Sequence, residues 1–260
     1  MKQRIITAIL SLIVFVPIVY MGSVILTTAL AILSLIALFE LFRMKGHSLL
    51  SVEGLIASIA LLLILIPSKQ GILGTLYSAN MLFYICVLLL LVSTVFSKNK
   101  FNFDDAAMAI LGSIYIGFGF KYFLLIRFEG LGLLLLALFI VWATDIGAYL
   151  VGRKFGKNKL APHISPNKTI EGSLGGVFSA LVVATIYFFV FPLDFSFGMT
   201  VILAILISVS GQLGDLVESA LKRHYQVKDS GKILPGHGGI LDRFDSILFA
   251  MPVLYLLTLV

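Results

Sequence analysis

Long apolar runs separated by short polar segments make up almost the whole chain. A helix of about 20 apolar residues is long enough to cross the hydrocarbon core of a bilayer. Runs of this kind recur along the 260 residues, and turn-forming residues such as Pro67-Ser68-Lys69 lie between them. The pattern predicts an all-α, polytopic membrane protein with about nine transmembrane helices, at residues 5–20, 23–42, 50–67, 78–97, 106–125, 131–151, 172–192, 198–221 and 240–259.

The composition argues against a soluble domain of this size. Hydrophobic residues make up 60% of the chain and charged residues 12%, whereas a typical soluble domain has about 25% charged residues. We therefore expect residues 1–260 to form a single integral membrane domain. Residues 1–125 are interpreted as spans that serve as scaffold and face lipid, and residues 131–260 as the spans that carry the polar motifs.

The Lys and Arg residues indicate how the chain is oriented. With nine spans and a cytoplasmic N-terminus, 16 of the 19 Lys and Arg residues fall on the cytoplasmic side, where positively charged loops usually lie. The two longest polar loops, about 152–171 and 222–239, fall on the same side. We expect a multi-pass protein of the plasma membrane whose active site faces the cytoplasm.

The net charge of +6 does not indicate a nucleic-acid partner. Nucleic-acid binding is typical of clustered Lys and Arg with exposed aromatic residues between them. Here the basic residues are spread over short loops between apolar runs. The lipid bilayer, with its head groups, and polyphosphates are the partners that this distribution favours.

A polar stripe interrupts the eighth apolar run. Asp215, Glu218, Ser219 and Lys222 are spaced so that they share one face of a helix. Ionisable residues within membrane segments usually face an interior cavity and mark a functional site. The polar character continues through residues 223–245, which makes this the densest polar region of the chain.

The residue types in this region suit the chemistry of phosphate groups. Carboxylates on adjoining helices can hold Mg²⁺, a hard cation that also binds substrate phosphates. Lys and Arg neutralise charge that develops at a transferring phosphorus. Glycines let backbone N–H groups approach phosphate oxygens. We see no Ser-His-Asp or Cys-His arrangement, so positioning and electrostatics are favoured over an acyl-enzyme route.

Eleven of these residues stand at set spacings near the C-terminus: Ser219, Lys222-Arg223, Lys228-Asp229, His237-Gly238-Gly239, Asp242-Arg243 and Asp245. The motif resembles, without departure, that of the CDP-diacylglycerol synthases, also called phosphatidate cytidylyltransferases. A second stretch, Ser165-Pro166-Asn167-Lys168-Thr169-Ile170-Glu171-Gly172, is also similar to the family, as is Asp145 before it. The resemblance covers roughly the C-terminal half of the chain.

The resemblance implies a Mg²⁺-dependent reaction of CTP with phosphatidate. A phosphate oxygen of the lipid would attack the α-phosphorus of CTP directly, and pyrophosphate would leave. It implies Asp215 and Asp242 as metal ligands, and it allows a monovalent cation such as K⁺ at the same centre and a homodimer. The other groups implied in catalysis are Lys222, Arg223, Lys228, Arg243 and Asp245. The implied substrate-binding residues are Ser219, Asp229, His237, Gly238, Gly239, Asp145, Ser165, Lys168, Thr169 and Glu171.

Other interpretations of the same residues stay open. A CTP-dependent membrane lipid kinase would use similar groups to move the γ-phosphate, and a secondary transporter would use buried carboxylates for ion coupling. Asp215 would also serve as a structural partner of Lys222, and Lys168-Thr169 as the start of a helix. The small residues Gly172, Gly176 and Ala180 favour close helix packing, within one chain or between two.

Overall fold

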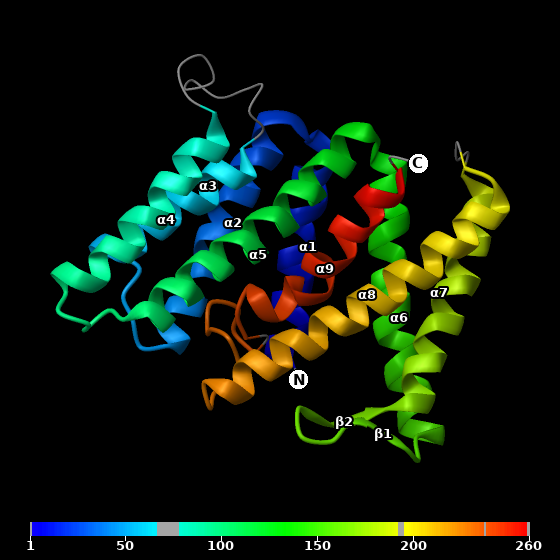
Figure 1. The fold of residues 1–260 in the computed structure, drawn as a ribbon. Coiled ribbons are helices and arrows are strands. Elements are labelled where there is room, and N and C mark those ends of the chain that lie inside the picture. Colours follow the sequence, from blue (N-terminus) through cyan, green and yellow to red (C-terminus); the bar gives the residue numbers. More distant parts are fainter. Residues whose placement is uncertain (1, 67–77, 192–194, 237, 259–260) are drawn as a thin grey trace. The chain divides into compact units, whose positions relative to one another are not determined.

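The computed structural model describes residues 2–66, 78–191, 195–236 and 238–258 (Figure 1). These residues form nine helices and one two-stranded sheet, so the predicted all-α class is confirmed. The helices are α1 (Lys2–Met21), α2 (Ser23–Met44), α3 (Val52–Leu65), α4 (Ala79–Phe96), α5 (Phe103–Glu129), α6 (Leu131–Phe155), α7 (Ile170–Val190), α8 (Phe197–His224) and α9 (Leu241–Thr258). The strands are β1 (Lys159–Ala161) and β2 (Ser165–Thr169).

Each predicted apolar run coincides with one helix. A helix satisfies its backbone hydrogen bonds internally, which is what an apolar surrounding requires. Six helices, α2 and α4 to α8, are long and apolar enough to cross a membrane, and α1 and α3 contain shorter apolar stretches. The first turn of α9 carries the polar residues of the motif. The total of nine crossings stays a prediction.

The antiparallel hairpin of β1 and β2 was not predicted. Its strands are short and polar, and they lack the alternation of apolar and polar residues that marks a half-buried strand. Lys159 pairs with Thr169, and Ala161 pairs with Ser165. The hairpin joins α6 to α7 and places Lys168 one residue before the N-cap of α7.

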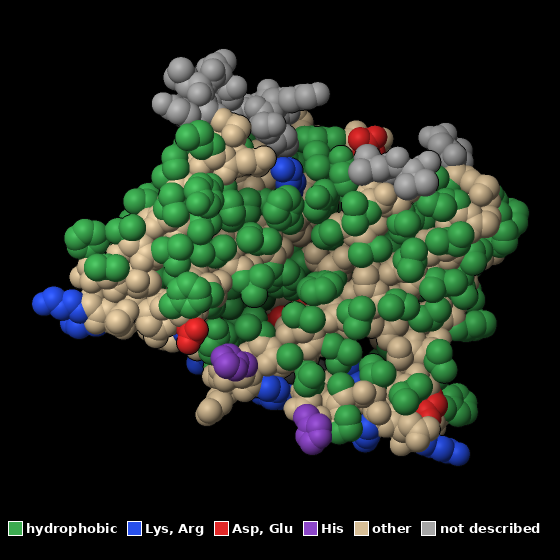
Figure 2. All heavy atoms as spheres, viewed as in Figure 1, with side chains coloured by type: hydrophobic (Ala, Val, Ile, Leu, Met, Phe, Trp, Pro, Cys, Tyr) green, Lys and Arg blue, Asp and Glu red, His purple; other side chains and the backbone are tan. Residues whose placement is uncertain are grey.

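Large apolar side chains lie on the outer surface of the helices. Ile13 is 61% exposed, Leu111 67% and Phe189 76%. Figure 2 shows hydrophobic side chains covering most of the visible face. Monomeric soluble proteins rarely expose apolar patches of this extent. The surface therefore fits a lipid surrounding, as the composition predicted.

The chain forms two compact units, and the first comprises Met1–Leu124 with Asp229–Leu241. In it α2 contacts α1 and α3, and α3 packs along α4. The buried Ser113 hydroxyl on α5 donates a hydrogen bond to the carbonyl of Ala57 on α3 (3.0 Å). A Cβ at Gly117 would lie 3.1 Å from the side chain of Ile64, so α5 approaches α3 closely there.

The second unit comprises Leu125–Lys228 with Asp242–Val260. Its α6 and α7 make the most extensive helix pair, and α8 packs on both. A Cβ at Gly176 would lie 2.9 Å from the carbonyl oxygen of Thr144, and one at Gly172 would lie 2.8 Å from that of Ala148. The glycines of α7 thus pack against α6 of the same chain. The close helix packing that their spacing favoured therefore occurs within one chain.

Candidate functional site

Three aspartates from three helices gather within the second unit. They are Asp145 on α6, Asp215 on α8 and Asp245 on α9. Asp145 and Asp245 both lie near enough to Asp215 for their negative charges to repel one another. The gathering depends on Gly214, where a Cβ would lie 2.5 Å from the carbonyl oxygen of Asp245. The missing side chain lets α9 approach α8 beside Asp215.

A lysine from the hairpin neutralises the central aspartate. Lys168 Nζ lies 2.5 Å from Asp215 Oδ2, and both side chains are about one third exposed, at 28% and 34%. The Ser219 hydroxyl, one turn further along α8, donates a longer hydrogen bond of 3.4 Å to Asp215 Oδ1. The structure thus brings together residues of both sequence motifs around one carboxylate.

A cavity of about 490 Å³ opens beside this ion pair. Asp145, Asp215 and Gln212 line it together with the basic Arg153 and Lys168. Ligand pockets typically measure about 300–1,000 Å³ and combine apolar walls with a few polar groups. The cavity is large enough for a small phosphorylated ligand, and it offers positive groups next to carboxylates.

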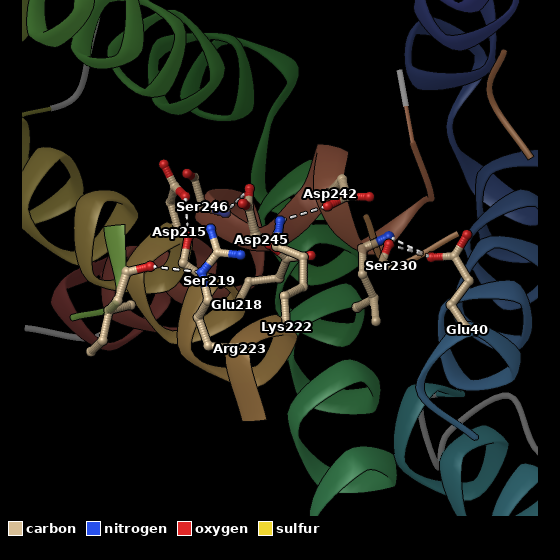
Figure 3. Close-up of polar contacts among 12 residues, drawn as sticks. Glu40, Asp215, Glu218, Ser219, Lys222, Arg223, Ser230, Asp242, Asp245 and Ser246 are labelled. Carbon is tan, nitrogen blue, oxygen red and sulfur yellow. Dashed lines mark hydrogen bonds and ion pairs between the residues drawn. The ribbon is translucent and has the colours of Figure 1, made fainter. Parts of the chain in front are cut away.

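A second ionic cluster joins α8 to α9 in the same unit. Lys222 Nζ lies 2.7 Å from Asp242 Oδ1 and forms an ion pair with Glu218, one helical turn earlier (Figure 3). The Glu218 side chain is fully buried and that of Asp242 is 5% exposed. Glu218 belongs to the polar stripe that the sequence indicated, and its i,i+4 spacing to Lys222 was the signal for this ion pair.

Two predicted substrate-binding residues organise the hairpin. Thr169 is the N-cap of α7, and its side chain accepts a hydrogen bond from the N–H of Gly172 (3.1 Å). The Glu171 carboxylate accepts hydrogen bonds from the backbone N–H of Lys157 (3.0 Å) and the side chain of Asn158 (2.7 Å). These contacts agree with the interpretation of this stretch as a helix start.

The remaining residues of the motifs are more dispersed. Arg223 Nε donates a hydrogen bond to the carbonyl of Ile164 in the hairpin (3.2 Å), next to the half-buried Ser165. Arg243 is exposed, and its charge acts on Asp145. His237 lies outside the described residues. Lys228 and Asp229 are exposed, while Gly238 exchanges two backbone hydrogen bonds with Leu234.

The first unit holds a buried carboxylate that the sequence analysis missed. Glu40 lies on α2 with no exposed surface. It accepts hydrogen bonds from the Ser230 hydroxyl (3.0 Å) and from the backbone N–H groups of Ile240 (2.9 Å) and Leu241 (3.0 Å). Figure 3 shows its side chain directed at Ser230. The available signal was a lone carboxylate inside the apolar run 23–42.

The donor set of the second unit suits a hard cation. Mg²⁺ binds oxygen ligands, commonly one or two carboxylates completed by water and substrate phosphates. Within the described ranges, no group of three His, Cys, Asp or Glu residues is arranged as a ready metal site. The two predicted ligands, Asp215 and Asp242, instead each form an ion pair with a lysine ammonium group. Each carboxylate is therefore placed where it binds a cation. Their carboxylate oxygens are the ligand type that Mg²⁺ takes, and substrate phosphates would complete such a set.

Comparison with known proteins decides the family. A model of the cytidylyltransferase family matches residues 2–260. The chain belongs to this family. It is 50% identical over 261 residues to the phosphatidate cytidylyltransferase of Bacillus subtilis (strain 168), an alignment that covers 99% of this chain and 97% of the relative. The enzymes of the same name from Staphylococcus haemolyticus (strain JCSC1435) and Staphylococcus aureus (strain COL) are 46% and 48% identical, over 99% of this chain and 98% of each relative.

These matches confirm the resemblance and extend it. The sequence motifs supported the cytidylyltransferase family over the C-terminal half alone, whereas the alignments run through the N-terminal helices as well. The six long apolar helices and this family membership together identify a multi-pass membrane protein.

Proposed function

We propose that this protein transfers the CMP group of CTP to phosphatidate, giving CDP-diacylglycerol and pyrophosphate. The observation that carries the proposal is the likeness, over 99% of the chain, to relatives named phosphatidate cytidylyltransferase. The cavity beside Asp215, with Lys168 and Arg153 among its lining residues, supports it. The positive charges of these two side chains suit the negative oxygens of a polyphosphate.

The reaction is a single displacement at the α-phosphorus of CTP. An anionic oxygen of the phosphatidate phosphate forms the new P–O bond, and the bond from the α-phosphorus to the bridging oxygen of pyrophosphate breaks. The nucleophile is already ionised at neutral pH, so no strong general base is required. The protein's contribution is to hold the two phosphates in line and to stabilise charge on the equatorial and leaving oxygens.

The charged groups of the second unit have separate tasks in this reaction. Asp215 and Asp242 would hold Mg²⁺, which when bound neutralises phosphate oxygens, and K⁺ is a candidate for the same carboxylates. Lys168 and Lys222 contact these carboxylates and carry flexible ammonium groups able to turn to phosphate oxygens. Arg223, Lys228 and Arg243 supply further positive charge for the leaving pyrophosphate. Asp245 and Asp229 would orient these groups or serve as further metal ligands, and Asp145 would contribute to substrate binding from the wall of the cavity.

The proposed reaction also bears on the orientation of the protein in the membrane. We propose nine crossings with a cytoplasmic N-terminus in the plasma membrane, so that the site faces the cytoplasm, where CTP is present. Phosphatidate reaches the site from the bilayer. We also propose a homodimer, in which the exposed apolar faces outside the α6–α7 pair provide the contact between copies.

Labelled CTP tests the reaction. The purified protein in liposomes containing phosphatidate is given Mg²⁺ and CTP labelled at either the α- or the γ-phosphate. The proposal expects α-label in the lipid phase, γ-label in released pyrophosphate and no γ-label in lipid. Transfer of γ-label to lipid would instead establish a kinase. Uptake of solutes without label transfer would establish a transporter.

A further inference from the structure

The fully buried Glu40 carboxylate closes the loop that carries the C-terminal motif. Burying a carboxylate is costly unless several hydrogen bonds replace its lost water. Ile240 N–H donates to Oε1, while Leu241 N–H and the Ser230 hydroxyl donate to Oε2. The contacts span 190 to 201 residues of sequence. All of these residues belong to the first unit.

The loop is shaped to admit this carboxylate. A Cβ at Gly231 or at Gly239 would overlap the Glu40 carboxylate, so a side chain at either position would displace it. The two glycines lie near opposite ends of loop 229–241. Glu40 therefore holds both ends of the loop at one point.

The same contacts cap a helix. Leu241 is the first residue of α9 and Ile240 precedes it, so the N–H groups that Glu40 accepts are among those that a helix start leaves without partners. A negative charge at this end also interacts favourably with the helix dipole. The cap comes from α2, far away in the sequence, in place of the Ser, Thr, Asp or Asn usual at the N-cap.

We propose that Glu40 is a positioning residue for the transfer reaction. The chain continues directly from Leu241 into Asp242 and Arg243, and Lys228 directly precedes the loop. Through Ser230, Ile240 and Leu241, Glu40 fixes the two ends of the loop to which these motif residues are covalently joined. It acts through the loop and touches neither substrate. The inference rests on the proposed function, because it concerns the residues assigned to that reaction.

Two variants test the inference through different atoms. Glu40→Gln keeps the shape but turns an NH₂ group toward backbone donors, and Gly231→Ala leaves Glu40 intact but pushes its carboxylate out of place. Each is expected to raise the CTP KM and the Mg²⁺ concentration for half-maximal rate about 10-fold, and their effects are expected not to add in the double variant. Glu129→Gln, the same change at the exposed end of α5, is the control and is expected to change nothing.

Hydrogen exchange provides a readout that does not require activity. In both variants the amides of Ile240 and Leu241 should exchange at least about 10-fold faster, while those of α4 stay unchanged. Loss of active protein with unchanged KM, Mg²⁺ requirement and local exchange would overturn the inference. If Glu40→Gln does not fold, Gly231→Ala and Ser230→Ala decide the question by the same measurements. A wild-type protein without CMP transfer would refute the proposed function, whereas local exchange would still show whether Glu40 holds the loop.

Discussion

Lys168 Nζ lies 2.5 Å from Asp215 Oδ2, so the second sequence motif supplies a counter-charge to the carboxylate proposed to bind metal. The lysine stands before the N-cap of α7 and the aspartate lies on α8. A divalent cation and an ammonium group compete for the same oxygen. Metal binding at Asp215 or Asp242 is therefore expected to weaken the contact of that carboxylate with its lysine.

Removing the Lys168 ammonium should strengthen metal binding and weaken catalysis. In Lys168→Met, the metal no longer competes with a positive charge at Asp215. We expect Mn²⁺, used as a spectroscopic probe, to bind about 3- to 10-fold more tightly, a change of about 1 kcal/mol typical of a partly exposed ion pair. CMP transfer should fall because a positive group for phosphate is lost. Titration by electron paramagnetic resonance measures the affinity.

Lys100→Met, an exposed lysine, serves as the control for this prediction. It should leave both Mn²⁺ affinity and transfer unchanged. Weaker Mn²⁺ binding in Lys168→Met would mean that the lysine supports the metal site instead of competing for it.

The cluster of Glu218, Lys222 and Asp242 should behave as one structural unit. Lys222→Met removes the ammonium group that contacts both buried carboxylates, and the loss of one partner from a buried ion pair costs about 3–5 kcal/mol of stability. Adding Glu218→Gln removes the buried charge of Glu218, so the double variant should be more stable than Lys222→Met alone. Thermal unfolding in detergent measures the stability of the wild type, the single variant and the double variant. A double variant less stable than the single one would refute the coupling.

Two glycine substitutions should have opposite effects on stability. At Gly176 a Cβ would meet the carbonyl oxygen of Thr144 at 2.9 Å, so Gly176→Ala should force α6 and α7 apart and cost about 1–3 kcal/mol. At Gly198, in the first turn of α8, a Cβ would have nothing within 4 Å. Gly198→Ala should be neutral or stabilising by up to about 1 kcal/mol through helix propensity. Equal unfolding temperatures for the two variants would contradict the described packing.

The sequence predicted all nine described helices because each apolar run carries its own signal. Span length and composition act locally, so the run at 198–221 indicated α8 without knowledge of its neighbours. The β1–β2 hairpin escaped because its strands pair polar residues over a few positions. The hairpin is held at the start of α7 by hydrogen bonds from Lys157 and Asn158 to Glu171. These contacts join residues 13 or 14 positions apart, so the strand propensity of a few neighbouring residues does not reveal them.

The site could be predicted only in part, for a similar reason. Spacing along α8 placed Asp215 and Lys222 on one face, and the family motif indicated Asp242. Spacing did not reveal that Lys168 pairs with Asp215, because that contact joins separate elements. Glu40 was still harder to recognise, since it contacts residues about 200 positions away.

A paired rate measurement tests the central claim, that CMP transfer depends on Asp215. The initial rate at which α-label from CTP enters phosphatidate is compared in liposomes for the wild type, Asp215→Asn and Asp104→Asn, which alters an exposed carboxylate in the first turn of α5. The account predicts label transfer by the wild type and Asp104→Asn at equal rates, and a loss of at least about 10²-fold in a folded Asp215→Asn. Asp215→Asn that transfers label within about two-fold of the wild type would contradict it.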